Sequence, residues 1–165
     1  SAILGAVSDL SIDEIVGYGT GIDEEGLEVK KNVIRKALAV NSPDADDGID
    51  ILHKIGGLEI GGMAGVMLGA AAARKPVIID GLISAAAALI AQKLAPGAVD
   101  FMFPSHCSQE PGQARIYELL NLEPFLDLEM RLGEGTGAVL AMNIIEASSR
   151  IVAEMATFAE AGIGE

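Results

Sequence analysis

The chain has 165 residues, which corresponds to one domain; half of them are hydrophobic, but only 4% are aromatic and none is Trp. Its core must therefore be built from aliphatic side chains, with Ala and Gly allowing helices and strands to approach closely. The formal net charge of −13 argues against nucleic acids and anionic membranes as partners, because both would require clustered Lys and Arg.

The single cysteine, Cys107, excludes an internal disulfide and is consistent with a reducing, cytoplasmic location. No second cysteine accompanies it, so the sequence predicts no metal site there. Residues 1–10 lack the basic start of a signal peptide, and the apolar stretch 81–91 is too short to span a bilayer.

The first half of the chain is predicted to be mainly helical. Residues 1–7 have the pattern of the tail of a helix that begins upstream, and Ile15 and Val16 are predicted to form a short strand after a polar turn. Further helices are predicted at 27–40, 48–55 and 57–73. The third of these is rich in Gly, Ala and Met, which favours a closely packed, buried helix, and His53 in the second is predicted to be structural.

The second half contains the clearest strand, Val77–Asp80, whose β-branched residues lie between Pro and Gly. An Ala-rich helix to about residue 94 follows it. Further strands are predicted at 99–103 and 126–130, and further helices at 113–120 and 138–161. Strands that alternate with helices indicate an α/β fold in which helices cover a parallel sheet.

Polar loops follow the predicted strands at Gly17–Gly21, Asp80–Ser84, Pro104–Ser108 and Arg131–Gly137. The carboxyl ends of parallel strands lie along one edge of a sheet, and ligands bind at that edge. These loops together therefore predict one composite binding site.

The loop Gly17–Gly21 could hold a phosphate with its backbone N–H groups. It has neither the spacing of a dinucleotide-binding loop nor the ending of a P-loop, so a plain tight turn is an equal alternative. Lys30 in the following helix could supply a positive charge to that phosphate. Its position beside Glu28 and Lys31 is more typical of a solvated helix lysine.

Asp80 and His106 are further candidates for a functional role. Asp80 directly follows a buried strand, where a carboxylate either holds a ligand hydroxyl or caps the next helix. His106 lies in a loop with Ser105 and Ser108 and could act as an acid or a base. The spacing of these residues reveals no Ser-His-Asp triad.

The segment Arg131–Gly137, RLGEGTG, is the most informative part of the sequence. Glycine on both sides of Glu134 lets the backbone approach a ligand and leaves the carboxylate uncrowded. An uncrowded, partly desolvated carboxylate is typical of a general base. The alternative is an acidic helix N-terminus with Thr136 as its cap.

Several stretches resemble the nicotinate-nucleotide:dimethylbenzimidazole phosphoribosyltransferase family, and the similarity covers nearly the whole chain. The most specific is Met130–Ala141, which contains RLGEGTGA. The others are KIGGLEI (54–60), AGVMLGAA (64–71), PVIIDG (76–81), PSHCSQE (104–110) and LEPFL (122–126).

The resemblance implies a Rossmann-like sheet within residues 1–137, a C-terminal helix at 138–165 that belongs to a small helical domain, and a homodimer. It implies transfer of the ribose phosphate of nicotinate mononucleotide to 5,6-dimethylbenzimidazole or a related base. The products would be α-ribazole 5′-phosphate, which is used in cobalamin biosynthesis, and nicotinate. No cofactor or metal is implied.

Carried over residue by residue, the resemblance makes Glu134 the catalytic base, and it places Lys30 and Ser108 on the substrate phosphate. The other substrate-binding positions that it implies are Gly17 and Gly19 near the phosphate, Asp80 and Gly81 on the nicotinate and ribose side, and also Leu132 and Gly133.

The family's N-terminal half, with much of its base-binding pocket and a second Glu, has no counterpart in this sequence. The resemblance is thus to the C-terminal half, and residues 1–165 alone are expected to be inactive. One alternative is a non-enzymatic half-domain that completes a partner chain. Another is a fragment of a dinucleotide-dependent oxidoreductase, which is disfavoured because no acidic residue ends a second strand about 20 residues after a GxGxxG motif.

Overall fold

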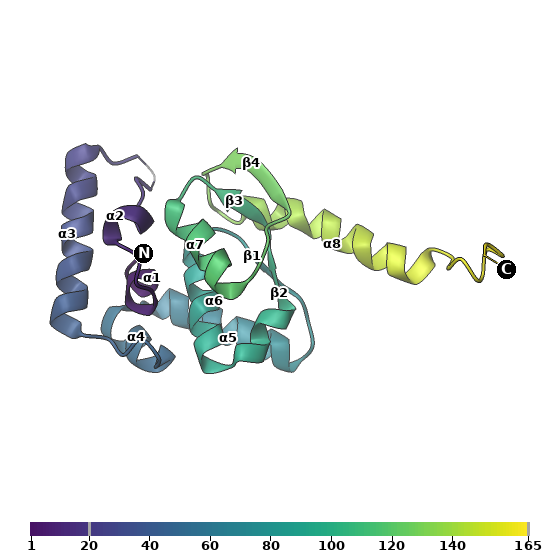
Figure 1. The fold of residues 1–165 in the computed structure, drawn as a ribbon, viewed down its shortest axis with the longest axis horizontal. Helices are drawn as coiled ribbons and strands as arrows, with labels where there is room; N and C mark the ends of the chain where they lie inside the picture. Colours follow the sequence, from purple (N-terminus) through teal and green to yellow (C-terminus); the bar gives the residue numbers. More distant parts are fainter. Residues whose placement is uncertain (20, 165) are drawn as a thin grey trace.

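A computed structural model describes residues 1–19 and 21–164, which form an α/β structure (Figure 1). Its helices are α1 (Ala2–Val7), α2 (Ile12–Ile15), α3 (Glu24–Asn41), α4 (Gly48–Ile55), α5 (Leu58–Ala72), α6 (Leu82–Leu94), the 3-10 helix η1 (Pro96–Phe101), α7 (Pro111–Leu120) and α8 (Thr136–Glu154). Its strands are β1 (Val77–Ile79), β2 (Met102–Pro104), β3 (His106–Ser108) and β4 (Leu126–Met130).

The strands pair in parallel, β1 with β2 and β3 with β4. Only Ser105 separates β2 from β3, so one extended segment is bordered by β1 along its first half and by β4 along its second half. The Ser105 N–H donates to the carbonyl of Ile79, and its own carbonyl accepts from the N–H of Leu126. The predicted α/β fold with parallel strands is confirmed.

The core is centred on α6, in which every residue from Ala85 to Ala91 is buried. α6 contacts α4, α5, α7 and η1. Because five of these seven side chains are Ala, the neighbouring helices can pack closely against it. Because α6 begins at Leu82, two residues after Asp80, the buried helix holds Asp80 beside the core.

The predicted strand at Ile15 and Val16 is wrong, because Ile15 ends the short helix α2. The helix begins at Ser11, where the Glu14 carboxylate accepts hydrogen bonds from the Ser11 N–H (3.0 Å) and hydroxyl (2.8 Å). A Ser and a Glu three residues apart form a capping box, which favours a helix start. Ile15 and Val16 are buried in the core cluster rather than paired in a sheet.

Two other boundaries differ from the prediction. The 3-10 helix η1 takes residues 96–101, which leaves β2 to begin at Met102, whereas the strand was predicted at 99–103. Pro96 favours this result, since proline suits the first turn of a helix. The segment Pro104–Ser108, predicted as a loop, contains β3. At the C-terminal end, α8 stops at Glu154 rather than near residue 161.

Helix α5 is not enclosed by protein, contrary to the prediction of a buried helix. Ala64 and Met67 face the core, but the side chain of Leu58 is 96% exposed and that of Val66 is also exposed. His53 on α4 is exposed too, and it lines a shallow apolar groove between α4 and α5. Composition identified the helix but could not distinguish its covered face from its open one.

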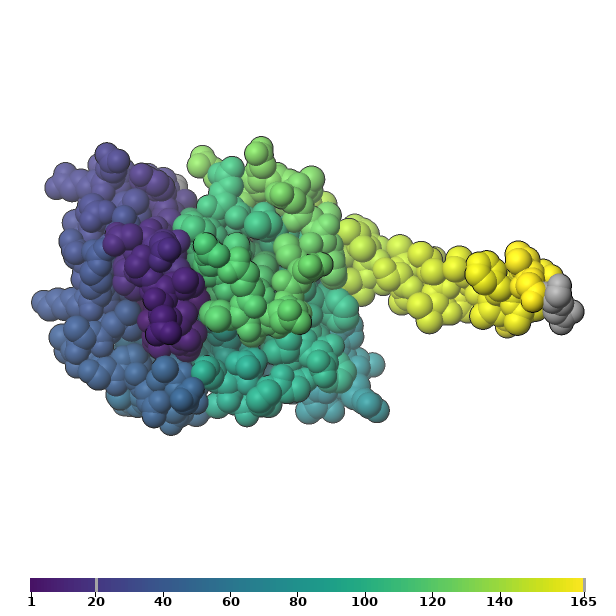
Figure 2. All heavy atoms as spheres, viewed as in Figure 1, coloured from purple at the N-terminus to yellow at the C-terminus, as the bar shows by residue number. Residues whose placement is uncertain are grey.

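Helix α8 projects from the rest of the molecule (Figures 1 and 2). Only its first turns touch β1, β3 and β4, and Gly137 and Ala141 are its buried residues. Within the part of the chain that the structure describes, none of the helices is both long and apolar enough to cross a membrane.

Candidate functional site

The loop between β4 and α8 holds Glu134 in an unusual backbone conformation. Gly133, Glu134 and Gly135 have φ angles of 81°, 58° and 77°, so three successive residues are left-handed. Such angles favour glycine and strain a residue that carries a Cβ. The carboxylate of Glu134 is exposed. The loop therefore presents this side chain to solvent on a tightly specified backbone.

Asp80, at the end of β1, fixes that loop. Its carboxylate oxygens accept hydrogen bonds from the N–H groups of Gly135 (3.2 Å) and Ala138 (3.0 Å). Asp80 thus caps α8, rather than the helix that follows it in sequence, and its negative charge suits a helix N-terminus. The start of α6 is instead served by Ser84, which accepts from the Asp80 N–H (3.0 Å) and donates to the Gly81 carbonyl (2.9 Å).

The side chain of His106 packs against the first turn of α8. Its side chain is buried, and its Nδ1 is 2.8 Å from the hydroxyl of Ser105. A Cβ at Gly137 would collide with the imidazole ring, so only glycine fits there. The ring is covered by protein and packs against this turn, and the acid or base role considered from sequence stays a prediction.

Gln113 is a buried polar residue that the sequence analysis missed. Its side-chain Nε2 contacts the carbonyls of Asp80 (2.9 Å) and His106 (3.0 Å) and the Tyr117 hydroxyl (2.8 Å), and its Oε1 accepts from the Ser108 hydroxyl. The available signal was its place on the apolar face of α7, one turn before Ile116 and Tyr117. Burial raises the pKa of Tyr117 to about 12, so its hydroxyl stays protonated.

The glycine-rich loop is held by Lys30 and Glu110. The Lys30 ammonium donates to the Gly17 carbonyl (2.8 Å), and the Gly19 N–H donates to the Glu110 carboxylate (2.7 Å). A Cβ at Gly17 would lie 2.6 Å from that carboxylate, which explains the glycine. Lys30 therefore does not behave as a solvated helix lysine. Thr20, in the same predicted loop, lies outside the described residues.

One chain of hydrogen bonds connects the two ends of the predicted site. It begins at Gly19, whose N–H donates to Glu110, and the Glu110 N–H donates in turn to the Ser108 hydroxyl (3.3 Å). The Ser108 hydroxyl donates to the side chain of Gln113, which donates to the Asp80 carbonyl. The structure thus connects Gly17, Gly19, Lys30, Ser108 and Asp80 with the loop that carries Glu134.

Three other predicted positions lie at the surface of this network without side-chain contacts to it. The Leu132 side chain is 71% exposed, and Cβ atoms at Gly81 and Gly133 would meet nothing. Residues 1–19 and 21–164 contain no group of three His, Cys, Asp or Glu side chains that could hold a metal ion.

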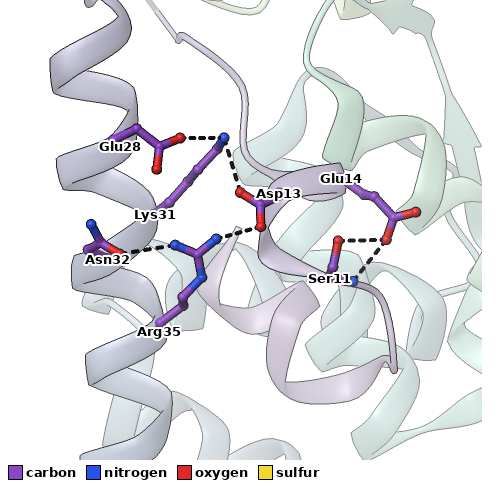
Figure 3. Close-up of polar contacts among 7 residues, drawn as sticks. All are labelled: Ser11, Asp13, Glu14, Glu28, Lys31, Asn32 and Arg35. Carbon is purple, nitrogen blue, oxygen red and sulfur yellow. Dashed lines mark hydrogen bonds and ion pairs between the residues drawn. The ribbon is translucent and has the colours of Figure 1, made fainter.

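Helices α2 and α3, which lead into and out of the glycine-rich loop, are joined by ion pairs (Figure 3). Asp13 on α2 lies 2.5 Å from Arg35 and 3.1 Å from Lys31, both on α3. Hydrogen bonds from Arg35 and then from Lys31 hold the pKa of Asp13 below its ordinary value. Lys31 also pairs with Glu28, which leaves Lys30 as the lysine that reaches the loop.

Comparison with known proteins places the whole chain in one group of enzymes. Residues 1–163 match a family model described as Phosphoribosyltransferase. The chain is 58% identical over 165 residues to the nicotinate-nucleotide–dimethylbenzimidazole phosphoribosyltransferase of Desulforamulus reducens, and 56% identical to that of Chloroflexus aggregans. In both cases the match covers 100% of this chain and 47% of the relative, so the chain spans about half the length of these proteins.

Solved structures give the same result. A crystal structure of CobT from Thermus thermophilus superposes with a TM-score of 0.91 at 43% identity, covering 99% of this chain and 49% of that one. A second structure, of the nicotinate-nucleotide–dimethylbenzimidazole phosphoribosyltransferase from the same organism, gives a TM-score of 0.88 at 41% identity, covering 99% of this chain and 48% of that one.

Proposed function

The chain belongs to this phosphoribosyltransferase family, and on that premise we propose that it supplies part of the active site for phosphoribosyl transfer from nicotinate mononucleotide to 5,6-dimethylbenzimidazole or a related base. The products are α-ribazole 5′-phosphate and nicotinate, in the synthesis of cobalamin. The names of its relatives support both substrates.

The observation that carries this proposal is the loop around Glu134. Glu134 is the residue of this loop for which a left-handed backbone is costly, since both of its neighbours are glycines, and the conformation persists where Asp80 ties the loop to the end of β1. Such strain concentrates at functional sites. The loop places a carboxylate at the sheet edge where ligands bind in parallel α/β folds.

Glu134 acts as the general base in this proposal. The bond between ribose and the pyridinium ring of the substrate breaks readily, because nicotinate leaves with a neutral ring nitrogen. One imidazole nitrogen of the benzimidazole attacks the ribose carbon, and Glu134 accepts the proton from the other. Attack opposite the leaving group converts the β-nucleotide into an α-nucleotide. A positioned base typically contributes about 10²–10⁴-fold to the rate.

The other end of the network binds the 5′-phosphate. Lys30 uses one ammonium proton for the Gly17 carbonyl and has two more to offer an anion. The Gly19 N–H is occupied by Glu110, so we assign Gly17 and Gly19 to shaping the loop around Lys30. Ser108 lies at the same end, but its one hydroxyl proton goes to Gln113, so we assign it to shaping that end. Asp80 and Gly81 lie on the side of ribose and nicotinate, and Leu132 and Gly133 belong to the substrate-binding loop of Glu134.

The test is an assay of the full-length protein with nicotinate mononucleotide and 5,6-dimethylbenzimidazole. We expect equal amounts of nicotinate and α-ribazole 5′-phosphate, with no requirement for a nicotinamide dinucleotide. Omitting the benzimidazole controls for hydrolysis of the nucleotide. A folded protein that forms neither product would contradict the proposal.

A further inference from the structure

Gln113 is a fully buried amide surrounded by the polar groups of three separate segments. It lies on α7, and its partners come from the end of β1 (Asp80) and from β3 (His106 and Ser108). A buried amide is costly unless its donors and acceptor are paired, and here all of them are. The side chain therefore acts as a cross-link between segments that are far apart in the sequence.

The orientation of this amide is fixed by its surroundings. The carbonyls of Asp80 and His106 can only accept hydrogen bonds, so Nε2 must face them. Oε1 is then left to accept the proton of the Ser108 hydroxyl. Flipping the amide would set Oε1 against two carbonyl oxygens, which excludes the alternative. The hydroxyl of Ser108 and the backbone of Asp80 are thereby held at a set separation.

We infer that Gln113 is a positioning residue that sets the distance between the phosphate-binding end of the site and the loop of Glu134. This inference rests on the proposed function. Ser108 belongs to the phosphate end, while Asp80 holds the Glu134 loop through the N–H groups of Gly135 and Ala138. Gln113 bonds to both residues and touches neither substrate.

The consequence is an effect on turnover rather than on binding. A nucleotide gripped by its phosphate needs its reacting carbon in line with the attacking base, and misplacement by about 1 Å can cost about 10²-fold in rate. Phosphate binding itself is assigned to Lys30, whose ammonium is placed by the Gly17 carbonyl. Loss of the cross-link should therefore lower kcat and leave the affinity for nicotinate mononucleotide nearly unchanged.

The experiment compares Gln113→Met with Tyr117→Phe in the full-length protein. Methionine keeps the length and burial of the side chain but removes its hydrogen bonds to Ser108 and Asp80. Tyr117→Phe removes a hydroxyl that contacts Gln113 and the Asp80 carbonyl but not Ser108, so it controls for lost stability. We expect kcat to fall at least tenfold in Gln113→Met, with the Kd of nicotinate mononucleotide within threefold of wild type, and neither to change by more than threefold in Tyr117→Phe.

A second variant, Gln113→Glu, decides the matter if Gln113→Met does not fold. Burial raises the pKa of the introduced carboxyl, and its neutral form can donate to one carbonyl and accept from Ser108. The titratable side chains near position 113 belong to Asp80, His106, Cys107, Glu110 and Tyr117. We expect kcat of Gln113→Glu, relative to wild type at each pH, to rise as the pH falls.

The outcomes separate the inference from the function on which it rests. A wild-type protein that binds nicotinate mononucleotide but forms no product overturns the proposed function and the inference together. An active wild type overturns the inference alone in any of three cases: Gln113→Met keeps kcat within threefold, Tyr117→Phe loses as much kcat as Gln113→Met, or the relative kcat of Gln113→Glu does not change with pH.

Discussion

Glu134 is the residue on which the proposed chemistry depends, and its carboxylate can be neutralised without changing its shape. We expect Glu134→Gln to lower kcat by about 10²-fold or more, with a much smaller rise in KM for nicotinate mononucleotide, because a base acts in the transition state. The steady-state rate of α-ribazole phosphate formation measures both. A variant within about threefold of wild type would remove Glu134 from the mechanism.

Lys30 is expected to recognise the phosphate rather than the pyridine ring. Lys30→Ala should weaken the binding of nicotinate mononucleotide much more than that of free nicotinate, which has no phosphate. Titration calorimetry with the two ligands provides the comparison. Lys31→Ala is the matched control, since Lys31 pairs with Glu28 and Asp13 instead of the loop. Equal losses for both ligands in Lys30→Ala would indicate damage to the fold.

Gly137 permits the close approach of α8 to His106. Gly137→Ala should destabilise the protein by about 1–3 kcal/mol, the usual cost of overpacking, because the added methyl group would overlap the buried imidazole. Urea unfolding measures this loss. Gly97→Ala serves as the control, since a Cβ at that position meets nothing. Equal unfolding midpoints for Gly137→Ala and wild type would mean that the ring can move aside at no cost.

Among the secondary-structure elements, α2 and α3 depend on the ion pairs of Asp13. We expect Asp13→Asn to lower the urea midpoint at neutral pH, with Asp9→Asn as a control because the structure describes no ion pair for exposed Asp9. The folded state holds the pKa of Asp13 below its ordinary value of 3.8. The stabilisation is therefore present above pH 3.8 and is lost as the pH falls through the lower folded value. The difference in urea midpoint between Asp13→Asn and wild type should disappear at acid pH. A difference that persists there would exclude the negative charge of Asp13 as its cause.

The sequence predicted those elements whose signals are local. Helix α4 matches its predicted bounds, and β4 does so as well, because periodicity and breaking residues mark their ends. The short strand β3 was missed, since three residues that pair only with a distant segment have no local pattern. At Ile15 the apolar pair suggested a strand, but the Ser11–Glu14 capping box favoured a helix.

In the candidate site, too, the sequence predicted the features that have a local signal and missed those that depend on distant contacts. The glycines around Glu134 gave a local signal, and the structure contains the left-handed backbone that they permit. Gln113 and Glu110 gave no such signal, because their importance comes from contacts with residues far along the chain. Asp80 was correctly singled out as a candidate cap, but the helix that it caps is the one 56 positions later, Thr136–Glu154, rather than the next one. The roles of these residues in catalysis remain predictions, as does the division of the chain at residue 137.

The surface of the protein as a whole carries large apolar side chains that nothing covers. Many of them lie along α8, where Val152 is 87% exposed and Ile151 is exposed, and just after it, where Met155 and Phe158 are exposed as well. Contiguous apolar surface of this kind favours association. We therefore expect residues 1–165, prepared alone, to form a dimer or a larger species. Lysine at both positions 151 and 152 should reduce that association.

We also expect residues 1–165 alone not to catalyse phosphoribosyl transfer. The chain spans 47% of the length of its relatives, and a site built from several loops loses its geometry when some of them are absent. Light scattering gives the mass of the species, and product formation from nicotinate mononucleotide and 5,6-dimethylbenzimidazole gives its activity. The full-length protein under the same conditions is the positive control. A monodisperse monomer with ordinary turnover would show that these residues contain a complete active site, and that the apolar face of α8 needs no partner.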